Sequence, residues 1–244
     1  MPFILPPEVQ SFLSSYRYKI ELHAHSSPIS SCAKHDVPTM MSLLKKEHFD
    51  GVVLTNHFYA GGKFMKTEDP VSTYLADYYQ ACEEGEKLGI QVYLGAEYRF
   101  AENSNDYLVF GADEALLRET VTRFDMTFNQ FYEQYHREDL LIVQAHPFRP
   151  GLVQMDPSHM DGVEAFNVHP HHNSMVALAA RWGQENSIPV ILAGTDFHNP
   201  GYEGLAATRT KILPKDNREL VALLRSGDYM MEIAGCPLLP YARF

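Results

Sequence analysis

The sequence lacks a long apolar run, a closely spaced cysteine pair and a basic leader. No stretch of about 18 apolar residues occurs, so we expect no membrane-spanning helix and no membrane partner. The segment MPFILPPEVQSF is apolar but short and broken by proline, which is not typical of a signal peptide. The cysteines form no CxxC motif, which argues against a disulfide framework and predicts a reducing, cytoplasmic compartment; they are Cys32, Cys82 and Cys236.

Basic residues are also in deficit. The chain has 20 Lys and Arg against 31 Asp and Glu, a formal net charge of -11. Proteins that bind nucleic acid through its phosphates usually have more basic than acidic residues, so extended nucleic-acid binding is disfavoured. A small anionic substrate remains compatible with this charge if metal ions supply local positive charge. The oligomeric state is not predicted.

What the sequence does have is alternation between strand-like and helix-like segments. The 244 residues fit one domain, 1–244, because α/β barrels commonly use about 250 residues. The expected strands are 18–25, 51–57, 90–100, 106–112, 140–147, 161–169 and 188–196, with weaker ones at 208–214 and 229–235. The expected helices are 37–48, 71–88, 128–137, 173–185 and 216–226, with Asn173 as a cap of the fourth.

The order and composition of these segments predict an α/β fold. Strand–helix alternation indicates parallel strands with right-handed crossovers, in an open doubly wound sheet or a barrel. Barrels gather functional groups from many strand ends at one mouth, whereas open sheets concentrate them at a switch point. Potential ligands stand at six separate strand ends here, which favours the barrel: His23, His25, His57, Glu97, His146, His169, Asp196 and His198.

Two short motifs place pairs of ligands on one face of a strand. His23-Ala24-His25 ends the first strand, and Asp196-Phe197-His198 ends a late one. Residues i and i+2 of a strand point to the same side, so each pair could bind one divalent ion. Each motif alone could also be polar residues entering a loop. Together they indicate a shared site, because barrel closure brings the first and last strands side by side.

Glu97, His146 and Arg149 extend this candidate site. Glu97 lies in the apolar segment YLGAEYRF, where a buried carboxylate without a partner would cost several kcal/mol. A metal ion would remove that cost, and the alternative is an ion pair with Arg99. His146 ends an apolar strand before Pro147, as a ligand or as a core histidine. Arg149 suits a phosphate or carboxylate, or lies exposed in a loop.

The segment VEAFNVHPHH offers further candidates. By strict strand alternation Asn167 and His169 share a face and Glu164 lies opposite, so we expect His169 to be the ligand and Asn167 its neighbour. His171 and His172 follow the strand and contact substrate or solvent. His57 closes the second strand.

The ordered motifs HAHS, LTNHF, GAEYRF, QAHPFR, EAFN and GTDFH, over residues 18–200, resemble the PHP (polymerase and histidinol phosphatase) family. The resemblance implies a distorted (β/α)7 TIM-like barrel, two or three divalent ions (zinc, manganese or iron) and phosphoester hydrolysis. It implies one ion on His23, His25, Glu97 and Asp196. A second ion would share Glu97 with His146 and a residue of EAFN, and a third would bind His57 and His198.

The sequence departs from the family pattern at two places. Asn56 stands where the family usually has Asp before the second-motif histidine. The third ion normally has another ligand soon after HxH, and four residues are candidates for it: Ser31, Cys32, His35 and Asp36. A cysteine thiolate would bind zinc well, although a free thiol is an equal alternative.

These motifs predict hydrolysis of a small phosphomonoester, similar to a histidinol phosphatase. A hydroxide bridging two ions would attack phosphorus while Asp196 holds metal, Arg149 stabilises the phosphoryl oxygens, and His198 or His57 protonates the leaving group if free of metal. Two alternatives stay open. One is an amidohydrolase-type metal hydrolase, which often needs a bridging lysine that no strand end here offers. The other is a metal-binding, non-catalytic regulatory module.

Overall fold

The computed structural model describes residues 5–239. Its helices are α1 (Pro7–Ser15), α2 (Val37–Lys46), α3 (Pro70–Leu88), α4 (Glu114–Thr120), α5 (Phe128–Tyr135), α6 (Val176–Glu185) and α7 (Asn217–Ser226), with 3₁₀ turns η1 (Lys63–Lys66) and η2 (Pro157–His159). Its strands are β1 (Tyr18–Ala24), β2 (Gly51–Leu54), β3 (His57–Phe58), β4 (Gln91–Tyr98), β5 (Tyr107–Phe110), β6 (Leu141–Gln144), β7 (Gly162–Asn167), β8 (Val190–Gly194), β9 (Ala206–Thr210), β10 (Tyr229–Ile233) and β11 (Cys236–Leu238).

Local sequence explains where the long helices begin and end. Asp36 caps α2 by accepting a hydrogen bond from the Thr39 amide, and Asp69 caps α3 in the same way through Ser72. Gly89 ends α3 in the left-handed conformation, with φ of 67°. The buried face of α2 repeats at helical spacing and packs against the central strands; it consists of Val37, Met40, Met41 and Leu44.

One eleven-stranded sheet has the order β11-β10-β9-β1-β2-β4-β5-β6-β7-β8, with β3 paired to β4. β1, β2 and β4 are parallel, as are β6, β7 and β8. The expectation of parallel strands is wrong for β5, which is antiparallel to both neighbours. Only eight residues, 99–106, join it to β4, and a parallel crossover needs about a dozen or more. β9, β10 and β11 extend β1 in antiparallel fashion.

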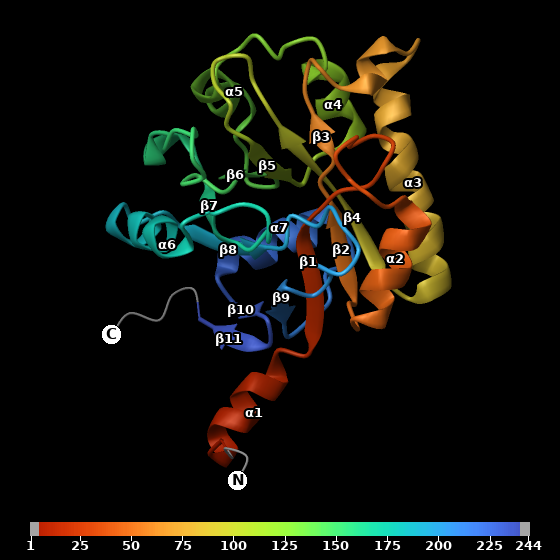
Figure 1. The fold of residues 1–244 in the computed structure, drawn as a ribbon. Coiled ribbons are helices and arrows are strands. Elements are labelled where there is room, and N and C mark those ends of the chain that lie inside the picture. The colour runs from red at the N-terminus through yellow and green to blue at the C-terminus, as the bar shows by residue number, and fades with distance from the viewer. Residues whose placement is uncertain (1–4, 240–244) are drawn as a thin grey trace.

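The sheet curls so that the end of β1 meets the chain that leaves β8 (Figure 1). Phe197 makes the junction: its amide donates to the carbonyl of His23 at 2.9 Å, and its carbonyl accepts from the amide of His25 at 3.1 Å. The mixed α/β fold with a curled, half-barrel sheet is therefore confirmed. The curl brings the HxH and DxH motifs side by side, as the barrel argument expected.

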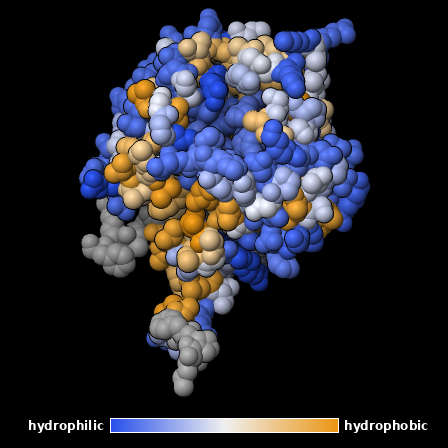
Figure 2. Space-filling view, viewed as in Figure 1, coloured by the Kyte–Doolittle hydropathy of each residue, from blue (hydrophilic) through white to orange (hydrophobic). Residues whose placement is uncertain are grey.

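Helices α2 and α3 cover one side of β1, β2 and β4 (Figure 1). Helix α1 projects from the start of β1, and none of its residues is buried. Figure 2 shows apolar side chains gathered over β8–β10 and α1, and mainly hydrophilic ones above them. Within residues 5–239, no helix is both long enough and apolar enough to cross a bilayer.

Two details differ from the helices expected from sequence. Asn173 does not cap α6, because its side chain accepts from the Met175 amide and the helix begins only at Val176. Helix α1 was not expected, since the segment before it carries two prolines and little amphipathic pattern. Its position outside the sheet leaves the predicted site unaffected.

Candidate metal centre

The two histidines at the end of β1 are held in fixed orientations. His23 Nδ1 lies 2.8 Å from Glu164 Oε1, and His25 Nδ1 lies 3.2 Å from Ser30 Oγ. Both rings are fully buried. Since each Nδ1 is engaged, both Nε2 atoms point away from these partners and toward the interior of the site. A hydrogen bond at one ring nitrogen that leaves the other free is the usual arrangement of a metal-binding histidine.

Four residues, His23, His25, Glu97 and Asp196, turn ligand atoms toward one another. His23 Nε2 lies 3.3 Å from Glu97 Oε1 and 3.4 Å from Asp196 Oδ1. His25 Nε2 lies 3.4 Å from Glu97 Oε2 and 3.3 Å from Asp196 Oδ1. A tetrahedral zinc site with bonds of about 2.0–2.1 Å requires ligand atoms about 3.3 Å apart. Neither Nε2 atom has a hydrogen-bond partner, although both are buried. These residues therefore fit a divalent ion.

Glu97 stands at the centre of the histidines. Besides His23 and His25, His57 Nδ1 lies 2.6 Å from its Oε2 and His146 Nε2 lies 3.4 Å from its Oε1. The alternative of an ion pair with Arg99 is wrong. Arg99 turns away and makes a bidentate pair with Asp106 at 2.7 Å through Nε and Nη2. Glu97 is thus placed to serve two ions at once.

A second group of ligand atoms also includes Glu97. His57, Glu97 and Asp106 bring ligand atoms within 4.8 Å of one another. His146 Nε2 is 3.9 Å from Asp106 Oδ2, and His146 is buried with Nδ1 unpartnered. His146 has a φ of 31°, a conformation that an ordinary residue adopts only under constraint from its surroundings. Asp106, which immediately precedes the antiparallel strand β5, was not expected at the site.

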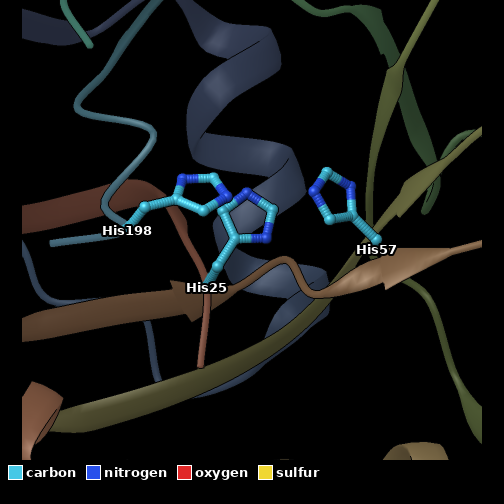
Figure 3. Close-up of side chains that lie close together, drawn as sticks. All are labelled: His25, His57 and His198. Carbon is cyan, nitrogen blue, oxygen red and sulfur yellow. The ribbon is translucent and has the colours of Figure 1, made fainter. Parts of the chain in front are cut away.

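A third group joins His25, His57 and His198 within the same 4.8 Å limit. Figure 3 shows the three rings converging from the end of β1, from β3 and from the loop after β8. Of the four candidates for a further ligand, Cys32 faces this group, with Sγ 3.1 Å from His198 Nε2. The others are committed elsewhere or exposed: His35 contacts the His25 carbonyl, Asp36 caps α2, and Ser31 is exposed.

The side-chain alternation expected along 161–169 is wrong, because β7 carries a register shift between Glu164 and Phe166. The irregularity turns Glu164 inward together with Asn167, whose Nδ2 donates to Glu164 Oε2 at 2.9 Å. His169 lies at the cavity wall, where its Nδ1 accepts from the His171 amide. It belongs to none of the closely spaced groups of ligand atoms among the described residues.

Arg149 lies against the site and is not free in a loop. Its Nη2 donates to Asp196 Oδ2 at 2.5 Å and to Asn167 Oδ1 at 2.6 Å, and its Nε donates to Ser174 Oγ at 3.2 Å. Asp196 thus turns one oxygen to the imidazoles and the other to the guanidinium. Asp196 has a φ of 54°, which Asp tolerates better than most residues.

The charges of the centre are strongly coupled. Burial opposes ionisation of Glu97, but His57 and His23 hold its pKa well below the usual value. Burial opposes protonation of His23, yet Glu164, Asp196 and Glu97 raise its pKa well above the usual value. Burial and the neighbouring His198 and His57 lower the pKa of His25. Such opposite shifts within a few ångströms are typical of functional sites.

The centre opens into a cavity of about 820 Å³. Its walls carry most of the candidate ligands and, toward solvent, Lys34, His171 and His172. A cavity of this size suits a small molecule.

The fold is shared with solved structures. A two-domain protein from Bacteroides vulgatus ATCC 8482, which contains a predicted PHP-like metal-dependent phosphoesterase, matches with a TM-score of 0.65 and 16% identity over 88% of this chain. PsfC from Pseudomonas syringae PB-5123 matches at 0.60 and 17% over 89% of this chain and 92% of its own. The lesion-specific endonuclease PfuEndoQ from Pyrococcus furiosus matches at 0.55 and 15% over 86% of this chain and 56% of its own.

This chain has a PHP-like fold. It spans 64% of the length of the Bacteroides protein. No family model matches the sequence, and no curated protein sequence matches it. The PHP resemblance drawn from the motifs is therefore confirmed by structure, at the level of the fold.

Within this PHP-like fold, six of the eight expected metal ligands gather with Glu97, and His169 lies at the cavity wall. Sequence reasoning missed Asp106 and the inward turn of Glu164. Asp106 could have been found from its position at the start of a strand-like run. No sequence signal marked the register shift that turns Glu164.

Proposed function

We propose that residues 1–244 form one metal-dependent hydrolase with a distorted (β/α)7 barrel of the PHP type, which hydrolyses a small phosphomonoester in the manner of a histidinol phosphatase. The imidazole-to-carboxylate distances of 3.3–3.4 Å among His23, His25, Glu97 and Asp196 carry this proposal. The cytoplasm is the proposed compartment.

The proposed ligands fall into three sets around Glu97. The first ion would bind His23, His25, Glu97 and Asp196. The second would bind Glu97 and His146 with Asp106 in place of a residue of EAFN, because Glu164 binds His23. His169 at the cavity wall is a further candidate for this ion. The third would bind His57, His198 and Cys32. Zinc, manganese or iron bound there would supply an activated water and neutralise phosphoryl charge.

Arg149 would orient the substrate. Its Nε and Nη2 are fixed by Ser174, Asn167 and Asp196, and Nη1 makes no hydrogen bond to a described residue. A guanidinium held at two nitrogens is already oriented, so binding a phosphoryl oxygen costs little further ordering. The cavity wall places this cation beside the ligands of the first ion, where charge builds up during phosphoryl transfer.

His198 is the proposed proton donor to the leaving oxygen. Burial disfavours its charged form, but Asp196 and Cys32 raise its pKa to about 10, so it holds a proton at neutral pH when no ion is bound. A histidine that ligates an ion through Nε2 cannot also donate that proton. Proton donation therefore requires that His198 be free of the third ion during turnover, with His57 as the alternative donor.

Two rival functions remain distinct from this proposal. An amidohydrolase-type centre would often use a bridging lysine, whereas the ion-pair partners of Glu97 among the described residues are histidines. A non-catalytic metal-binding module would keep the same ligands without turnover. The endonuclease among the structural neighbours makes DNA a further substrate to test.

Elemental analysis and a substrate panel on protein reconstituted with Zn²⁺ or Mn²⁺ test the proposal. We expect bound metal and turnover of p-nitrophenyl phosphate or another phosphomonoester, with no cleavage of an N-acyl amino acid, a lactone or a DNA oligonucleotide. Asp196→Asn should abolish turnover and keep the circular dichroism spectrum, because Asn also tolerates the positive φ. Bound metal without any hydrolysis would support the regulatory module instead.

A further inference from the structure

A smaller side pocket opens beside the metal centre. It has a volume of about 220 Å³ and shares Cys32, His57 and Arg99 with the main cavity. Its remaining wall comes from the loop after β3 and from the loop after β1, and it includes Tyr59 and Lys63. A ligand bound at the centre could therefore extend across His57 into a second, separate chamber.

The charge of this side pocket is opposite to that of the chain. The protein has 11 more acidic than basic residues, yet no carboxylate lines the pocket, whereas Lys63 and Arg99 both do. Lys63 makes no ion pair within residues 5–239. Arg99 uses Nε and Nη2 to bind Asp106, and its Nη1 makes no hydrogen bond to a described residue.

Packing of the loop after β3 holds Lys63 at this wall. Lys63 begins the turn η1, and the next residue, Phe64, is buried. The Phe64 ring stacks on Phe58 with centroids 5.5 Å apart and meets Tyr74 at 5.2 Å. The Gly62 amide donates to the Tyr59 carbonyl at 3.1 Å. Because both sides of Lys63 are anchored, its side chain starts from a defined backbone position at the pocket wall.

Cys32 also lines the side pocket, and its Sγ lies 3.1 Å from His198 Nε2, so the thiol faces the imidazoles of the third group of ligand atoms. Arg99 already pairs with Asp106 through two nitrogens, whereas no carboxylate of a described residue pairs with Lys63. The ammonium of Lys63 and the Nη1 atom of Arg99 therefore remain available to a ligand.

We propose that the side pocket binds a second anionic group of the substrate, a carboxylate or a phosphate, and that Lys63 determines specificity for it. This inference rests on the proposed function, because the first phosphate would occupy the metal centre. The substrate class is then a phosphomonoester that carries a further anion, with Arg99 placed between the two groups. Lys63 touches only the distal anion and takes no part in bond cleavage.

Phosphonates test this subsite, since their carbon–phosphorus bond is not hydrolysed. Calorimetry on protein loaded with Zn²⁺ or Mn²⁺ compares butylphosphonate, 4-phosphonobutyrate and butane-1,4-diphosphonate. We expect at least one of the two ligands with a charged tail to bind about three- to tenfold tighter than butylphosphonate, as for a partly exposed ion pair. Whichever of 4-phosphonobutyrate and butane-1,4-diphosphonate binds with the higher affinity shows whether the second group is a carboxylate or a phosphate.

Two matched lysine variants assign the effect. Lys63→Met should remove most of the preference for a charged tail and leave butylphosphonate affinity unchanged. Lys66→Met loses the same charge three residues later, outside the side pocket, and should retain the preference. Equal affinity for all three phosphonates, or a preference that survives Lys63→Met, overturns the subsite while leaving the metal centre supported. Failure of butylphosphonate and both charged ligands to bind overturns the subsite and the proposed phosphoesterase together.

Discussion

Glu164 binds His23 at 2.8 Å and thereby determines which nitrogen of this histidine faces the metal centre. The carboxylate also accepts from Asn167 and from the His146 amide. One residue of β7 therefore links three parts of the site. Its effect is exerted through His23, so Glu164 is a positioning residue.

Glu164→Gln tests this link. An amide keeps the size of the side chain but loses the charge that stabilises the Nδ1–H tautomer of His23. We expect metal affinity to fall about 10- to 100-fold, with the fold retained. Competition with a chelator measures the metal affinity. Glu185→Gln, which changes an exposed glutamate on α6, is the control. Unchanged affinity would mean that the contact does not orient His23.

Gly194 makes the same contact sterically possible. A Cβ at this position would collide with Glu164 Oε1 and lie 2.7 Å from His23 Cβ. We expect Gly194→Ala to weaken metal binding and to cost about 1–3 kcal/mol of unfolding free energy. Gly183→Ala, on α6, is the control. Its Cβ would lie 2.7 Å from Ile191 Cδ1, the end of a flexible side chain that can move away. The chelator assay compares the metal affinity of the two variants, and urea denaturation compares their unfolding free energy. Equal metal affinity in both variants would contradict the steric role.

Cys32 should make the third site selective for zinc. Thiolates prefer zinc to manganese, and Cys32 Sγ already lies beside His198. Cys32→Ser should lower zinc stoichiometry or affinity and change manganese binding little. Cys236→Ser, an exposed cysteine on β11, is the control. The same loss for both metals would indicate a structural effect of the thiol rather than ligation.

Glu21 should make stability depend on pH. It is fully buried on β1, and burial raises its pKa to about 7 against a usual value of 4.5. The folded state therefore binds more protons than the unfolded state between these pH values, and stability falls as pH rises through that window. A shift of this size corresponds to about 3 kcal/mol.

Glu21→Gln should remove this contribution. Its unfolding free energy relative to the wild type should grow by about 3 kcal/mol from pH 4.5 to above pH 7. Urea denaturation in the presence of a chelator measures the difference at each pH. Glu83→Gln, exposed on α3, should show no such trend. A constant difference between Glu21→Gln and wild type across this range would contradict a raised pKa.

Much of the site was predictable from local patterns. The HxH and DxH motifs place ligands by the two-residue period of a strand, and that period holds wherever the strand is regular. His146 and Glu97 stood out as polar residues in apolar runs, where burial without a partner would be costly. The expected helices 37–48, 71–88 and 216–226 correspond to α2, α3 and α7, each of which an aspartate caps in the structure.

The sequence by itself determined most strands, the principal helices, and Glu97 with six of the residues gathered near it, because side-chain period and the cost of a buried charge are local properties. Tertiary structure alone decided the rest. The reversal of β5 brought Asp106 to Arg99, the irregularity in β7 turned Glu164 toward His23, and the curl of the sheet brought Cys32 to His198. Each of these depends on how strands pair with one another in the sheet, which the pattern within one segment does not encode.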